Sequence, residues 1–241
     1  MLDTLSEAWR DLVLGSSCVG CSSPGRLLCD ACRASLDPRP APAWPTPRSP
    51  GLTDPWAATP YDGTVRAMVL GHKEHRLLGL AGPLGDLLAV AVEAALDELL
   101  PVFGEGARLA LVPVPSRPST VRQRGHEPTT TLTRAAAARL SRPGRPAVCV
   151  PLLRTRRGLA DQSGLDAEAR RLNLAGAFRV HHPALRRLAR DGRPVHVLVC
   201  DDVLTTGATL AEAQRALRAV GLPPLAGVAV AATRRRLPAP A

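Results

Sequence analysis

The sequence predicts an α/β protein with a parallel sheet and flanking helices, preceded by a small cysteine-rich module. Four apolar segments, at 109–114, 148–152, 195–201 and 225–232, have the composition of buried parallel strands. Segments with apolar residues at helical spacing lie between and around them, at 82–100, 129–140, 183–190 and 210–220. Alternation of this kind is typical of a parallel sheet with helices packed on it.

The composition fits a globular protein with a positive charge. The chain has 241 residues, 45% of them hydrophobic, and a formal net charge of +10. The charge is consistent with binding to polyanions, and equally with the excess of Arg and Ala that a high-GC genome produces. Residues 1–7 include acidic side chains and no basic start, so we expect no secretory signal, no membrane insertion and a cytoplasmic location.

One stretch, from 195 to 221, carries the clearest chemistry. An apolar strand over 195–200 is followed by Asp201 and Asp202, which we expect at its carboxyl end. The next residues form a turn rich in hydroxyl groups and glycine, which leads into the 210–220 helix and its capping Gly221. We assign a phosphate-binding role to residues of this stretch: Val203, Leu204, Thr205, Thr206, Gly207, Ala208 and Thr209.

The order of these groups suits a ribose phosphate. Unpaired N–H groups at a helix N-terminus attract a phosphate, and Gly207 lets the backbone approach it closely. Carboxylates repel a phosphate but accept hydrogen bonds from sugar hydroxyls. The stretch therefore predicts a ribose 5-phosphate site, with the sugar on Asp201 and Asp202 and the phosphate on the turn.

Two C-x-x-C motifs near the N-terminus predict a metal site. Cys18, Cys21, Cys29 and Cys32 can close a tetrahedron around zinc if a tight hairpin brings the two motifs together. Such a site has no open position for a substrate, so its role is structural. An iron–sulfur site, a redox pair and an empty site are the alternatives to zinc.

Basic residues elsewhere are candidates for a pyrophosphate site. A strand at 108–113 ends in a proline-rich turn with Pro115 and Ser116, and an Arg-Gly loop follows. Arginine forks match phosphate oxygens, and a lysine at the end of an earlier helix can also reach a ligand. The candidates in this group are Ser116, Pro115, Arg117, Arg122, Arg124 and Lys73.

The motifs together resemble a known family. Asp201 to Thr209 resembles the 5-phosphoribosyl 1-pyrophosphate (PRPP) signature of type I phosphoribosyltransferases, except that Ala208 stands where many members have a second glycine. With the cysteine motifs, the Val-Pro-Val-Pro strand end and the Arg-Gly loop, the chain is similar to the ComF family over nearly its full length. It departs at His126-Glu127, where the family commonly has Phe-Asn, and at Glu74, where it often has Tyr.

The resemblance implies a domain plan and a function. It implies a zinc module at 1–36, a Pro-rich linker at 37–60, a phosphoribosyltransferase-like domain at 61–236 and a tail at 237–241. The expected activity is Mg-dependent transfer of ribose 5-phosphate from PRPP to an acceptor, linked to DNA uptake or nucleotide salvage, with Asp201 and Asp202 as catalytic residues. The alternative is a non-catalytic protein that senses PRPP or binds single-stranded DNA.

Overall fold

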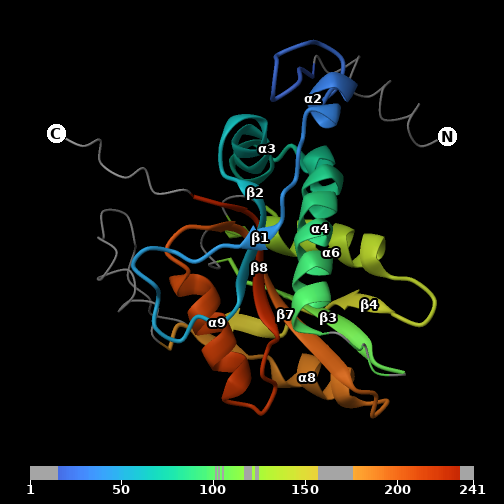
Figure 1. Ribbon diagram of the computed structural model, residues 1–241, viewed down its shortest axis with the longest axis vertical. Coiled ribbons are helices and arrows are strands. Elements are labelled where there is room, and N and C mark those ends of the chain that lie inside the picture. The colour runs from blue at the N-terminus through green and yellow to red at the C-terminus, as the bar shows by residue number, and fades with distance from the viewer. Residues whose placement is uncertain are drawn as a thin grey trace.

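The computed structural model is built around one six-stranded sheet (Figure 1). It describes residues 16–100, 102, 104, 106–116, 121–122, 125–156 and 176–233. The strands are β1 (Ala41–Pro42), β2 (Pro55–Pro60), β3 (Arg108–Pro113), β4 (Ala147–Cys149), β7 (Val195–Leu204) and β8 (Ala226–Ala232), with β5 (Leu153–Thr155) and β6 (Phe178–Val180) forming a separate pair. The helices are α2 (Asp30–Ala34), α3 (Gly63–Glu74), α4 (Ala81–Leu99), α6 (Pro128–Leu140), α8 (His182–Ala189) and α9 (Ala208–Arg218), with a short 3₁₀ turn η1 at Leu78–Leu80.

The strand order confirms the predicted α/β class. It runs β1-β2-β8-β7-β3-β4, and each neighbouring pair is parallel except β1 with β2. β7 lies at the centre and pairs with β3 from Arg108 opposite Val195 to Pro113 opposite Cys200. The carboxyl ends of the parallel strands therefore share one edge of the sheet, which is where ligands bind in folds of this kind.

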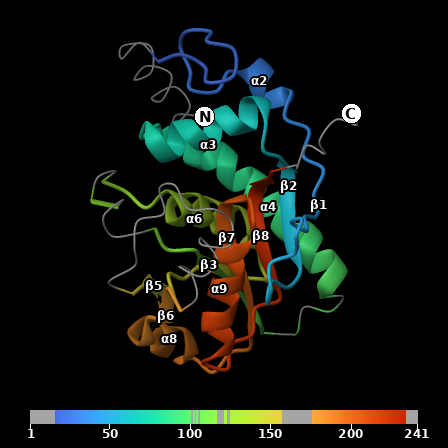
Figure 2. The ribbon, with the colours of Figure 1, turned by 90° about the vertical axis from the view of Figure 1, so that its left-hand side faces the viewer.

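Alternating side chains divide the core into two layers. Leu198 and Cys200 of β7 pack with α3, α4 and α6, whereas Val197 and Val199 pack on the opposite face with α9. α4 and α6 approach closely at Gly85: a Cβ at this position would lie only 2.5 Å from the Cβ of Ala135. The views in Figures 1 and 2 show α9 on the other side of the sheet from α4.

The most apolar helix belongs to this core. The segment Leu78–Leu99 is long and apolar enough to cross a membrane by length and composition, with a mean hydropathy of 1.5. About half of it, 56%, is buried inside the protein, and α4 packs against α6, β8 and β2. A buried core helix satisfies the same criteria.

Several elements differ from the expected bounds. The expected linker, 37–60, contributes β1 and β2 to the sheet, with β2 parallel to β8. The strand expected at 148–152 ends at Cys149, and the chain then turns into the separate pair of β5 and β6. Gly221 follows α9 with φ of 74°, the left-handed conformation of a helix cap, as predicted.

Candidate functional site

The two aspartates lie inside the central strand and not after it. β7 continues to Leu204 because its pairing with β8 extends as far as Leu204 opposite Ala232. On its other side, pairing with β3 stops at Cys200. Asp201 and Asp202 therefore lie where β7 projects past β3. They follow the end of the pairing with β3, but they are still paired with β8 or flanked by residues that are.

Backbone groups hold both carboxylates in place. The N–H of Asp202 donates to Oδ1 of Asp201, and the N–H of Val203 donates to Oδ1 of Asp202, both at 2.8 Å. In each aspartate, one carboxyl oxygen is therefore bound by the main chain. Val203 and Leu204, both expected at the phosphate, still pair with β8.

Lys73 joins this pair from the other layer. Its Nζ lies 2.7 Å from Oδ2 of Asp202, whose side chain is 6% exposed, compared with 33% for the lysine. Lys73 reaches Asp202 from the last turn of α3, which packs over the sheet through Val65, Met68 and Val69. The structure therefore brings Lys73 to the aspartates.

The surroundings of Asp201 raise its pKa. Burial and the adjacent Asp202 raise the pKa of Asp201 from 3.8 to about 8, and Lys73 opposes that shift only in part. Asp201 is therefore largely protonated at neutral pH in the free protein.

The turn after β7 has the predicted form. Gly207 has φ of 75°, which glycine adopts at little cost, and α9 begins at the next residue. The Thr206 hydroxyl accepts a hydrogen bond from the Ala208 N–H at 3.4 Å. Thr205 is exposed, whereas Thr206 and Thr209 are partly buried. The turn places the N-terminus of α9 beyond the end of β7.

The proline-rich turn after β3 meets the same edge of the sheet. The Val114 N–H donates to the Cys200 carbonyl at 2.9 Å, so Pro115 and Ser116 follow at the point where β7 continues past β3. Arg122 is exposed. Arg117 and Arg124, the other two arginines expected at a pyrophosphate, lie outside the described residues.

Two histidines connect the Arg-Gly loop to the helix that carries Lys73. The His126 ring donates from Nε2 to the His72 carbonyl at 3.0 Å, and the His72 ring donates from Nε2 to the Pro128 carbonyl at 3.3 Å. Burial lowers the pKa of His72, and the Pro128 carbonyl opposes that shift. Neither histidine could be given this role from the sequence, because only the fold brings the end of α3 to the start of α6.

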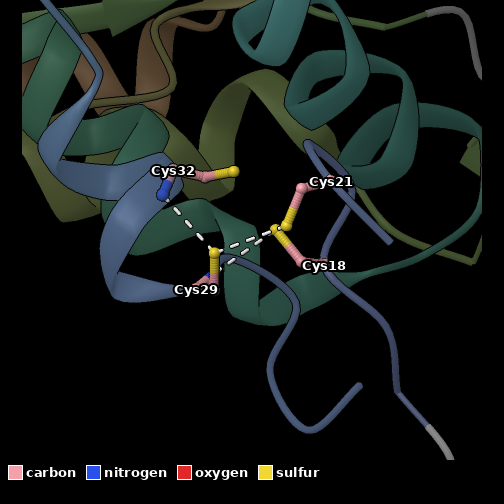
Figure 3. Close-up of side chains that lie close together, drawn as sticks. All are labelled: Cys18, Cys21, Cys29 and Cys32. Atoms are coloured by element: carbon pink, nitrogen blue, oxygen red, sulfur yellow. Dashed lines mark hydrogen bonds between the residues drawn. The ribbon is translucent and has the colours of Figure 1, made fainter. Parts of the chain in front are cut away.

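The four cysteines form one cluster at the N-terminal end of the described chain (Figure 3). Their Sγ atoms all lie within 4.8 Å of one another. The second motif begins α2, where Cys29 Sγ accepts the Cys32 N–H at 3.4 Å, and the expected hairpin is reduced to a single bridge between Ser17 and Pro24. A helix start and a turn bring the motifs together, and four thiols at this spacing fit a tetrahedral metal site.

Two of the four thiols have pKa values shifted in opposite directions. Burial acts to raise the pKa of Cys18, but N–H groups of Cys29, Cys21 and Gly20 together lower it to about 6. Close thiol neighbours, Cys29 first, raise the pKa of Cys32 to about 12. Thiolates crowded in this way repel one another, and a divalent cation removes that repulsion.

The cysteine cluster packs against α3. Cys18 and Leu28 belong to the same apolar core as Met68 of α3. A Cβ at Gly20 would lie 2.8 Å from Cys32 Sγ and 3.0 Å from Thr64 Cγ2, so the first motif fits tightly between the second motif and the start of α3. The helix that carries Lys73 at its end thus contacts the cysteine cluster at its start.

A scan against protein-family models and a search of curated proteins find no match to this chain.

Proposed function

We propose that the protein binds PRPP and transfers its ribose 5-phosphate to an acceptor, with release of pyrophosphate. The observation that carries this proposal is the arrangement on β7 and α9: two carboxylates on the strand, then a left-handed glycine turn, then a helix N-terminus. Along the chain, groups that can bind sugar hydroxyls come first and groups that can bind a phosphate follow. Ribose 5-phosphate carries hydroxyls and a phosphate at a matching separation.

The aspartates suit the sugar. Asp201 and Asp202 each have one oxygen bound by a backbone N–H, which fixes the side chain. Oδ2 of Asp202 is buried against Lys73, so the ribose hydroxyls would bind mainly at Asp201, whose protonated carboxyl group can donate as well as accept. When the bond from ribose C1 to pyrophosphate breaks, its electron pair leaves with pyrophosphate and positive charge develops on the ring, which the nearby Asp202 carboxylate would stabilise.

Hydrogen-bond donors near the aspartates suit the leaving group. Lys73 contacts Asp202, the partly buried Ser116 follows β3 at the same edge of the sheet, and both can donate to phosphate oxygens. The resemblance to the ComF family implies magnesium with PRPP, and carboxylate and pyrophosphate oxygens are the hard ligands that it prefers. The acceptor's nucleophilic atom would then form the new bond to C1.

Calorimetric titration with PRPP and magnesium tests this function. Wild type should bind, and Asp201→Asn should lose binding and turnover while it keeps its fold. The matched control is Asp37→Asn, an exposed aspartate that pairs with Arg39. Unchanged binding in Asp201→Asn would refute the assignment.

We also propose that the four-cysteine cluster holds a structural zinc ion. Its four sulfur donors leave no position for a substrate, and so small a module needs the energy of metal binding to fold. One zinc per chain, measured by mass spectrometry of the native protein, is the expected result. Iron in its place would contradict the assignment.

A second candidate function is binding of single-stranded DNA, favoured by one group of arginines. Burial lowers the pKa of His181, the residue before α8, and the positive charges of Arg154, Arg179, Arg186 and Arg187 lower it further, so four cations act on this end of α8. Among the described residues, none of the four pairs with a carboxylate. With aromatics at 2% of the chain, such binding would rest on phosphates and not on base stacking.

Salt dependence distinguishes this candidate. Binding of a labelled oligothymidylate should weaken with salt, and Arg154→Gln with Arg187→Gln should reduce the slope of log K against log salt by about 0.7 for each phosphate that is no longer bound. Arg39→Gln, at an exposed ion pair elsewhere, is the control. An unchanged slope would contradict it.

A further inference from the structure

The Pro-rich segment between β1 and β2 lies against the turn that precedes α9. We call residues 43–53 the strap. The Ser49 hydroxyl donates to the Thr206 carbonyl at 2.6 Å, and Leu52 is buried in the same apolar cluster as Ala208. In Figure 1 the strap is the pale blue loop beside α9. The strap is therefore part of the wall around the turn.

Other bonds anchor the strap farther along α9. Gln214 is fully buried, and its side-chain amide accepts the Thr53 N–H at 3.0 Å and donates to the Thr53 carbonyl at 2.8 Å. The Arg218 guanidinium donates to the Gly51 carbonyl at 3.2 Å and to the Thr53 hydroxyl at 2.5 Å. These contacts fix the strap on α9. The bond from Ser49 also attaches the strap to the turn before α9.

Ser49 controls the direction of one peptide group. The peptide between Thr206 and Gly207 is trans, so its C=O and its N–H point in opposite directions. Because the Ser49 hydroxyl holds the C=O on the strap side, the Gly207 N–H points away from the strap. Among the described residues, that N–H has no hydrogen-bond partner.

We propose that Ser49 is a positioning residue for the phosphate turn, which directs the Gly207 N–H at the 5-phosphate of the ligand. The inference rests on the proposed function, since it needs a phosphate at the turn. The close fit of strap and turn supports it: a Cβ at residue 207 would lie 2.6 Å from Leu52 Cδ2 and 3.3 Å from Pro45 Cγ. The turn keeps its shape because the strap holds it from outside.

Calorimetric titration of PRPP with magnesium into full-length variants tests the role of Ser49. Ser49→Ala should weaken binding about 5- to 10-fold, the effect of removing one hydrogen bond that orients a donor. Ser49→Thr keeps the hydroxyl and should bind within about twofold of wild type. Arg218→Gln is the matched control, because it loosens the strap at the far end of α9 without touching the turn. It should lower the melting temperature but leave PRPP affinity within about twofold of wild type.

The outcomes separate the inference from the proposed function. Wild-type affinity in Ser49→Ala would overturn the role of Ser49 while leaving PRPP binding in place. Equal weakening in Ser49→Ala and Arg218→Gln would show that the strap acts only through stability, which also overturns it. If wild type itself does not bind PRPP, the proposed function fails, and the inference fails with it.

Discussion

The cysteine cluster and the acidic site are assembled over very different lengths of chain. All four cysteine donors come from residues 18–32, and a turn and the start of α2 bring them together. The acidic site joins Asp202 on β7 to Lys73 on α3, and Ser49 of the strap bonds to the turn that follows β7. A local site depends on spacing in the sequence and on its metal, whereas a distributed site depends on the packing of the whole domain. Four changes test that difference.

The largest expected effect is in the cysteine cluster. Cys29→Ser removes one of four donors, and the free energy of about 10 kcal/mol or more that zinc supplies to such a module is lost. Metal content should fall from one per chain, and amide exchange over 16–36 should become fast while the central strands stay protected. Cys149→Ser, outside the cluster, should change neither. Full metal content in Cys29→Ser would show that the four sulfurs do not form the site.

The acidic site should respond to loss of its lysine. Lys73→Met leaves the buried Asp202 without its cation, which we expect to cost about 3 kcal/mol of unfolding free energy, the lower end for a broken buried pair because Lys73 is partly exposed. Urea unfolding at neutral pH measures it. The double variant Lys73→Met with Asp202→Asn removes the unpaired charge and should recover most of the loss. A double variant no more stable than Lys73→Met would contradict the pairing.

The pH dependence of the acidic site is the third test. The pKa of Asp201 is about 8 in the folded protein and 3.8 ordinarily, so between these values the folded state keeps a proton that the unfolded state releases. This contribution to stability is present below about pH 4 and is lost as the pH rises toward 8, by at most about 1.4 kcal/mol per pH unit.

Asp201→Asn does not titrate, so its stability relative to wild type should increase from pH 4 to pH 8. Urea midpoints across that range measure the difference, with Asp37→Asn as the control. A constant difference between Asp201→Asn and wild type would contradict the raised pKa. A rising difference would show that the acidic pair is held in place at the expense of stability.

The smallest expected effect comes from an exposed ion pair in the cysteine module, which is nearly as short as the pair between Lys73 and Asp202. Arg26 Nη1 lies 2.8 Å from Asp30 Oδ1, but these side chains are 48% and 83% exposed. Arg26→Gln should change the unfolding free energy by less than about 0.5 kcal/mol. Urea unfolding of Arg26→Gln and Lys73→Met under the same conditions compares the two losses of unfolding free energy directly. A loss as large as that of Lys73→Met would show that burial does not separate the two pairs.

What the sequence predicts follows the same division. The cysteine cluster and the turn at Gly207 could be predicted because each is set by a short contiguous pattern. The partner of Lys73 and the hydrogen bonds of His72 could not, because they depend on how α3 packs over the sheet.

The missed strand β2 has a different cause. Proline is unfavourable within a central strand, and β2 begins at Pro55 and ends at Pro60, so the segment resembles a linker. The full length of β7 was missed for a related reason, since aspartate is depleted in strands. In both segments, pairing with β8 outweighs the local preference.

The strap has a consequence for the order in which the chain folds. Its bonds to the turn and to α9 join residues 157, 161, 165 and 167 positions apart in sequence. Contacts at such separation carry a large loop-closure entropy and form slowly. During synthesis, the turn reaches its final geometry only after the last quarter of the chain has met a segment made long before it.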